Sequence, residues 1–197
     1  GTGFDFARIM IEANERLPRN TIIANGAGNY TTWIHRYYQY GPHKTQLAPN
    51  NGAMGYGVPA GIAASLVYPE RLVVSFAGDG CFMMNCQELA TAVRYDLPVI
   101  FIVINNGSYG TIRMYQERLY PNRIHGTDLS NPDFEIFAKS FGIHGETVEK
   151  TEEFWPAFER ARAAAGPALI EVRLDIETLS AGASLREIRE AHAARAK

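Results

Sequence analysis

The sequence predicts an α/β fold in which a doubly wound, mainly parallel sheet carries helices on both faces. Two continuously apolar runs, residues 72–77 and 99–104, flank a helical pattern at residues 85–95 and so form a βαβ unit. Strands that are apolar throughout are typical of a parallel sheet with both faces covered. A chain of 197 residues with 46% hydrophobic content can bury a sizeable core, and we expect one domain over residues 1–197.

The first expected elements come before this unit. Apolar residues at helical spacing predict a leading helix over residues 4–17, which Pro18 ends. A short β-branched strand at 21–24 runs into a glycine-bearing turn, and the aromatic stretch that follows is compatible with a helix. A Gly/Ala-rich segment at 53–68 then predicts a close-packed helix, which leads into the strand at 72–77.

Further helices and strands alternate after the βαβ unit. A helical stretch runs from the polar loop 105–107 towards Tyr120, and we expect the next helix to begin at Asn131 with Pro132 in its first turn. The remaining expected elements are a strand at 145–148, a helix at 151–165, a strand at 168–174 and a polar amphipathic helix from about 184.

Charge and cysteine content exclude several classes of protein. Nineteen basic and 21 acidic residues give a formal net charge of −2, so we expect no nucleic-acid partner and no membrane partner. Two cysteines are too few for a disulfide framework, and no apolar run reaches the length of a membrane span. We therefore expect a cytoplasmic protein whose partners are small molecules or other protein surfaces.

Two sharp polar loops follow neighbouring strands of the predicted sheet. Gly78-Asp79-Gly80 ends the first strand of the βαβ unit, and Asn105-Asn106-Gly107-Ser108 ends the second. Ligands of open parallel sheets collect beyond the carboxyl ends of the strands. The glycines leave room for a bulky anion, and Asp79 offers a carboxylate that a divalent cation could share with it. The second loop can add an amide oxygen and a main-chain carbonyl, which suits Mg²⁺.

Each loop taken alone is also compatible with an ordinary strand-ending turn. We expect both loops to be exposed, so that substitution of Asp79 or Asn106 leaves the core intact.

The turn Gly26-Ala27-Gly28 is only weakly similar to a dinucleotide fingerprint, because it lacks the third glycine and the acidic residue that would hold a ribose. Neither cysteine and none of the five histidines is assigned a catalytic role.

The spacing of the two loops resembles a known cofactor motif. Asn106 stands 27 positions after Asp79, as in the cofactor-binding motif of thiamine diphosphate enzymes. The resemblance extends through the segments 51–60, 87–93 and 109–117 and so covers nearly the whole chain. Together these segments resemble the C-terminal thiamine diphosphate domain of acetolactate synthase catalytic subunits. The implied fold is the thiamine diphosphate-binding fold.

The resemblance also implies roles for individual residues. The side chains of Asp79 and Asn106 and the carbonyl of Ser108 match the Mg²⁺ ligands, and Met54 matches the catalytic residue that wedges between the two rings of the cofactor. Further positions match contacts to the cofactor: Asn29, Tyr30, Gly78, Gly80, Cys81, Tyr109 and Gly110 near the diphosphate, and Gly52 with Met54 at the aminopyrimidine. Tyr115 stands on the substrate side, where a tryptophan is usual, and Asn29-Tyr30 stands where Gln-His is usual.

The implied activity is decarboxylation of a 2-keto acid such as pyruvate and ligation of the resulting carbanion to a second carbonyl. Another thiamine diphosphate-dependent decarboxylase or carboligase, or a noncatalytic module that binds a phosphate ligand, remains the alternative. In the family, the carboxylate that activates the cofactor belongs to a pyrimidine-binding domain of the same or another subunit. We find no such domain in residues 1–197, so we expect this chain to be inactive by itself and to form a homo-oligomer.

Overall fold

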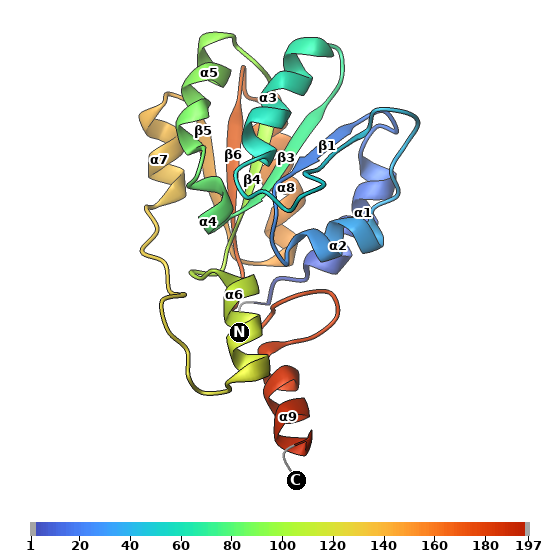
Figure 1. Cartoon of the computed structure of the whole chain (residues 1–197). Helices are drawn as coiled ribbons and strands as arrows, with labels where there is room; N and C mark the ends of the chain where they lie inside the picture. Colours follow the sequence, from blue (N-terminus) through green and yellow to red (C-terminus); the bar gives the residue numbers. More distant parts are fainter. Residues whose placement is uncertain (1–2, 196–197) are drawn as a thin grey trace.

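The computed structural model describes residues 3–195, which form a six-stranded sheet with helices on both faces (Figure 1). Every strand pair in the sheet is parallel, and the strand order is β2-β1-β3-β4-β6-β5. The strands are β1 (Ile22–Asn25), β2 (Gln46–Leu47), β3 (Val73–Gly78), β4 (Val99–Asn105), β5 (His144–Val148) and β6 (Ala168–Arg173). This order confirms the doubly wound α/β fold.

Helices cover both faces of the sheet because alternate strand residues point to opposite sides. One face packs against α1 (Phe6–Arg16), α2 (Thr31–Tyr37) and α8 (Thr151–Ala163). The other packs against α3 (Gly57–Val67), α4 (Asp79–Phe82), α5 (Leu89–Arg94) and α7 (Phe134–Ser140). The buried side chains form one apolar cluster on each face of the sheet, and β4 contributes to both. Ile100 and Ile102 belong to the cluster with α1, α2 and α8, whereas Val99 and Phe101 belong to the cluster on the other face.

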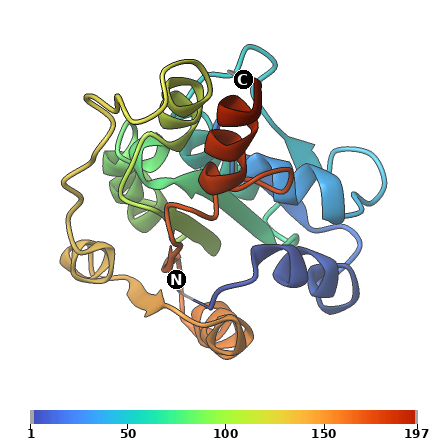
Figure 2. The same ribbon diagram turned by 90° about the horizontal axis from the view of Figure 1, so that it is seen from below.

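Two further helices lie beyond the carboxyl edge of the sheet. Figure 2 looks towards that edge and places α9 (Leu185–Arg195) beside α6 (Gly110–Leu119). A small apolar cluster of their own holds them together, and Arg189 of α9 pairs with the buried Glu117 of α6 at 2.9 Å. Between residues 3 and 195, no helix combines the length and the apolar character needed to cross a membrane.

Several expected boundaries were wrong. The helix expected at 53–68 begins at Gly57, because residues 54–55 form a turn before it. The helix expected at 85–95 is divided into a 3₁₀ turn, η1 (Cys86–Glu88), and α5. The helix expected to begin at Asn131 begins at Phe134, where the Asp133 side chain caps it by accepting a hydrogen bond from the main-chain N–H of Ile136 at 2.8 Å.

Asp79 does not lie in an exposed loop. It begins the short helix α4 directly after β3, and only 3% of its surface is exposed. The strand β2 was not expected at all; its two residues pair with β1 at the edge of the sheet, and their sequence has no alternating pattern that could have indicated it.

Candidate functional site

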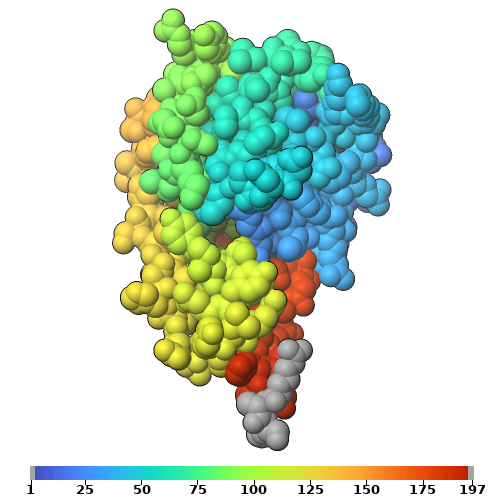
Figure 3. Space-filling model, viewed as in Figure 1, coloured from blue at the N-terminus to red at the C-terminus, as the bar shows by residue number. Residues whose placement is uncertain are grey.

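A pocket opens at the carboxyl edge of the sheet, where the order of the strands reverses between β1 and β3. The chain moves from β1 outwards to β2 and then returns across β1 to β3, so the loops after these two strands diverge and leave a crevice. The surface is hollowed where the loop after β1, the turn before α3 and helix α6 meet (Figure 3). Ligand sites of open α/β sheets occur at this position in the fold.

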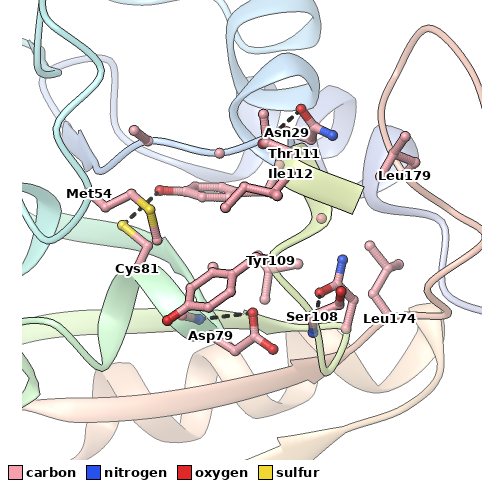
Figure 4. A pocket seen from close by; sticks show the side chains of 18 of the residues that line it. Asn29, Met54, Asp79, Cys81, Ser108, Tyr109, Thr111, Ile112, Leu174 and Leu179 are labelled. Carbon is pink, nitrogen blue, oxygen red and sulfur yellow. Dashed lines mark hydrogen bonds between the residues drawn. The ribbon is translucent and has the colours of Figure 1, made fainter. Parts of the chain in front are cut away.

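Asp79 forms part of the pocket wall, and its carboxylate is held by hydrogen bonds. Its Oδ1 accepts from the main-chain N–H of Gly80 at 2.9 Å (Figure 4). Its Oδ2 accepts from Nδ2 of Asn131 at 2.8 Å. Burial raises the pKa of Asp79, while these bonds and the N–H groups of Gly107 and Ser108 oppose that shift. Among the described residues, no cationic side chain contributes to the shift, so the carboxylate lacks a positive partner.

The loop after β4 lies against Asp79. The Oδ1 of Asn106 accepts from the N–H of Ser108 at 3.2 Å, which gives the loop a tight turn. The Ser108 hydroxyl and the Tyr109 N–H both bond to the carbonyl of Thr127, at 2.9 and 2.8 Å. The segment around Thr127 therefore fixes the loop, and it brings oxygen atoms of Asn106 and Ser108 to the same pocket as Asp79.

The loop after β1 provides the opposite wall. The Oδ1 of Asn29 accepts from the Thr111 hydroxyl at 3.0 Å, so this loop is joined to the start of α6. The Tyr30 hydroxyl donates to the carbonyl of Phe76 at 3.3 Å and lies 3.8 Å from the Cys81 sulfur. Burial raises the pKa of Tyr30 well above its ordinary value. The ring of Tyr30 thus lines the pocket, while its hydroxyl points into the protein.

Met54 lies in the turn that precedes α3, next to Cys81 (Figure 4). Two hydrogen bonds hold this turn against the segment after β3. The Gly55 N–H donates to the Cys81 sulfur at 3.2 Å, and Nδ2 of Asn85 donates to the Gly55 carbonyl at 2.9 Å. These bonds fix the main chain next to Met54, whose half-buried side chain lines the pocket.

Glycines occur where the walls come closest. A Cβ atom on Gly26 would lie 2.3 Å from the Cys81 sulfur, and one on Gly80 would lie 2.6 Å from the Tyr109 ring. A Cβ on Gly78 would lie 3.3 Å from the Tyr30 ring. Any side chain at Gly26 or Gly80 would displace a residue of the pocket wall, so the shape of the pocket depends on these glycines.

The pocket brings together all the residues expected at the site except Gly52 and Tyr115. Those that line it are Asn29, Tyr30, Met54, Gly78, Asp79, Gly80, Cys81, Asn106, Ser108, Tyr109 and Gly110. Gly52 is exposed in a turn with φ of +69°. Tyr115 is exposed on α6, where the Arg118 guanidinium lies over its ring, one turn beyond the lining residue Ile112.

Sequence reasoning missed other residues of the site. Thr111 and Ile112 from α6 line the pocket, as do Trp33, Ile104, Leu174 and Leu179. Asn131, which contacts Asp79, was read as the start of a helix, and nothing in its local sequence indicates a partner 52 positions away. Within residues 3–195, no group of three or more His, Cys, Asp or Glu side chains is placed to hold a metal ion, and the pocket itself contains one carboxylate.

Comparison with known proteins gave consistent matches. Residues 26–172 match the family model described as thiamine pyrophosphate enzyme, C-terminal TPP binding domain. The chain is 31% identical over 169 residues to the Escherichia coli acetolactate synthase isozyme 2 large subunit, covering 85% of this chain and 31% of that protein. It is 34% identical over 158 residues to the Saccharomyces cerevisiae mitochondrial acetolactate synthase catalytic subunit, covering 80% of this chain and 23% of that protein.

A solved structure is similar over most of the chain. The thiamine diphosphate-dependent 4-hydroxybenzoylformate decarboxylase of Rhodococcus jostii RHA1 superposes with a TM-score of 0.82 at 31% identity. The match covers 89% of this chain and 33% of that chain. The chain thus spans about a third or less of the lengths of these relatives.

Proposed function

Since the chain belongs to the thiamine pyrophosphate enzyme family, whose C-terminal TPP-binding domain it matches over residues 26–172, we propose that its pocket binds thiamine diphosphate through Mg²⁺. The observation that carries this proposal is the buried Asp79 carboxylate at the carboxyl edge of the sheet, which has hydrogen bonds but no cationic partner among the described residues. A buried carboxylate without a positive charge nearby is unfavourable, and a bound divalent cation would remove that penalty.

The donor set around Asp79 fits Mg²⁺. The side chains of Asp79 and Asn106 and the carbonyl of Ser108 all offer oxygen, which Mg²⁺ prefers over nitrogen or sulfur. One protein carboxylate suffices because Mg²⁺ is commonly bound by one or two carboxylates together with substrate phosphates. We assign these three residues as the metal ligands.

The glycine-lined walls support binding of the diphosphate. Gly78, Gly80, Cys81, Tyr109 and Gly110 would surround it mainly with main-chain groups, and Asn29 would face it from the loop after β1. Tyr30 is expected to contribute its ring rather than its hydroxyl, because the hydroxyl already donates to Phe76.

Met54 and Gly52 are assigned to the other end of the cofactor. Met54 would support the bent cofactor between its two rings, for which an unbranched thioether is suited. Gly52, although outside the pocket lining, belongs to the same turn and would present its carbonyl to the aminopyrimidine. The cavity has a volume of about 70 Å³, well below that of typical ligand sites, which supports partial rather than full enclosure by this chain.

The chemistry that thiamine diphosphate supplies when bound is a nucleophilic carbon and an electron sink for the decarboxylation of a 2-keto acid. We propose that the protein to which this chain belongs resembles acetolactate synthase, because its relatives include acetolactate synthases from bacteria and yeast. It would decarboxylate a pyruvate-like acid and join the product to a second carbonyl. Decarboxylation of an aromatic 2-keto acid is the second candidate, favoured by the match to the 4-hydroxybenzoylformate decarboxylase.

A second domain is part of this proposal. Asp79 is the one acidic residue that lines the described pocket, and it is assigned to the metal. The proton transfers of catalysis would then need a carboxylate from elsewhere, which we assign to a pyrimidine-binding domain of the same or another subunit in a homo-oligomer. Residues 1–197 alone should release no CO₂ from pyruvate above the rate of free cofactor.

Calorimetric titration tests the binding proposal. Thiamine diphosphate should bind the chain in the presence of Mg²⁺ and much more weakly without it, and ADP should not reproduce this behaviour. Asp79→Ala should abolish the Mg²⁺-dependent part, whereas Glu88→Ala should leave it unchanged, because Glu88 is a half-buried carboxylate outside the pocket lining. Equal binding of thiamine diphosphate with and without Mg²⁺, or equal binding by the Asp79 variant, would refute the ligand assignment.

A further inference from the structure

Asn131 connects the ends of two strands that carry the site. It lies before α7, and its Nδ2 donates to Oδ2 of Asp79 at 2.8 Å and to Oδ1 of Asn105 at 3.0 Å. Asp79 follows β3, whereas Asn105 ends β4 directly before Asn106. One amide group therefore fixes the position of the Asp79 carboxylate relative to the loop that contains the other expected metal ligands.

The orientation of Asn105 is determined by its other contacts. Its Oδ1 accepts from the main-chain N–H of Gly107 at 3.0 Å, and a main-chain N–H can only donate. The amide oxygen of Asn105 must therefore face Gly107 and Asn131. Its NH₂ group then faces the opposite way, where it donates to Oε1 of Glu171 at 2.6 Å.

Glu171 is the last member of this series of hydrogen bonds. It lies within β6, is 1% exposed, and also accepts from the Thr147 hydroxyl at 3.0 Å. Nε of the Arg173 guanidinium lies 3.4 Å from the same oxygen that Asn105 contacts. Because burial of a carboxylate inside a sheet is costly, an apolar residue would be the default here, and nothing in the metal or diphosphate contacts assigned above uses Glu171.

We propose that Glu171 and Asn131 are positioning residues for the metal-binding carboxylate of Asp79. Glu171 orients Asn105, Asn105 orients Asn131, and Asn131 holds Oδ2 of Asp79 in place. The series has one direction: Glu171 accepts from the NH₂ group of Asn105, so the oxygen of Asn105 faces Asn131 and accepts from the Asn131 NH₂ group, which also donates to Asp79. This inference rests on the proposed function, since it takes Asp79 to be a ligand of Mg²⁺.

Substitutions at Glu171 separate hydrogen-bond direction from packing and charge. Glu171→Met keeps the volume but removes the acceptor, so the NH₂ group of Asn105 loses its partner and the Gly107 N–H is the remaining bond that orients this amide. Glu171→Gln keeps an acceptor oxygen for Asn105, and its NH₂ group can donate to Thr147. Glu149→Gln is the matched control, because Glu149 is an exposed carboxylate that pairs with the same Arg173 but lies outside the series.

The measurement is Mn²⁺ binding to the 197-residue chain in the presence of thiamine diphosphate, followed by electron paramagnetic resonance of the free ion. Glu171→Met should weaken Mn²⁺ affinity about 10- to 100-fold, as removal of residues that orient metal ligands typically does. Glu171→Gln and Glu149→Gln should stay within about threefold of the parent chain. Asn131→Leu, at a half-buried position outside the sheet, should repeat the loss and covers the case in which Glu171→Met fails to fold.

The outcomes distinguish this inference from the proposed function. Parent-like Mn²⁺ affinity in Asn131→Leu or in a folded Glu171→Met would overturn the positioning role and leave the proposed function intact. Equal weakening by Glu171→Gln and Glu171→Met would also overturn it, because the effect would then follow the charge and not the acceptor. Failure of the parent chain to bind Mn²⁺ with thiamine diphosphate would refute the proposed function, and the positioning role with it.

Discussion

Replacement of Gly57 by alanine should destabilise the protein by about 2 kcal/mol. A Cβ atom at this first residue of α3 would lie 2.7 Å from the Gly26 nitrogen and 3.0 Å from the Phe76 carbonyl oxygen. Both are main-chain atoms of adjacent segments and cannot rotate away, so α3 would have to move off the sheet. Overpacking of this kind costs up to about 3 kcal/mol, and the higher helix propensity of alanine returns at most about 1 kcal/mol.

Thermal unfolding followed by circular dichroism measures the effect. For a chain of this size, 2 kcal/mol corresponds to a fall of about 4–8 °C in the unfolding midpoint. Gly61→Ala is the matched control in the same helix. Its Cβ would meet side-chain atoms, 3.0 Å from Ser75 Cβ and 3.5 Å from Val99 Cγ1, so it should change the midpoint by less than about 4 °C. A Gly57→Ala variant that melts with the parent, or above Gly61→Ala, would refute the reasoning.

Four further expectations concern the site. Because burial raises the pKa of Asp79, Mg²⁺ binding followed by calorimetry should fail at a higher pH than an exposed aspartate would predict. In the metal-free chain the same shift makes the free energy of unfolding fall as pH rises from the unfolded to the folded pKa of Asp79. Urea unfolding should therefore give a difference between the parent and Asp79→Asn that grows through this interval and is constant above it. In the assembled enzyme, Met54→Ala should slow deuterium exchange at the reactive carbon of the cofactor more than it weakens cofactor affinity, and unchanged exchange would contradict the assigned role. Tyr115→Trp should alter the relative rates for pyruvate, 2-ketobutyrate and aromatic keto acids without changing cofactor binding; identical ratios would show that Tyr115 does not set specificity.

The central strands of the fold could be predicted because burial on both faces leaves a direct trace in the sequence. The runs predicted at 72–77 and 99–104 correspond to β3 (Val73–Gly78) and β4 (Val99–Asn105). The edge strand β2 leaves no such trace, because its two residues are held by pairing with β1 and are not fully buried. The start of α7 was misjudged because Asn131-Pro132-Asp133 offers two residues suited to capping, and only tertiary contacts decide between them.

The candidate site was predictable where it follows from strand ends and not where it depends on contacts between distant segments. Asp79 and Asn106 follow adjacent parallel strands, so their proximity is a consequence of the fold. The buried Asp79 accepts from Asn131, 52 positions away, and the inward direction of the Tyr30 hydroxyl depends on the Phe76 carbonyl, 46 positions away. Neither contact has a local pattern in the sequence.

The attachment of α6 and α9 has a consequence for how the pocket opens. These helices share a small apolar cluster that is separate from the two clusters against the sheet, and the Glu117–Arg189 ion pair joins them. Elements with few contacts to the main core can unfold locally at a lower free energy than the whole domain. Native-state hydrogen exchange should therefore reveal α6 and α9 as one cooperative unit that opens while the sheet stays protected. Local unfolding of α6 and α9 would then determine how long the pocket stays folded, whereas the melting temperature reports unfolding of the whole protein.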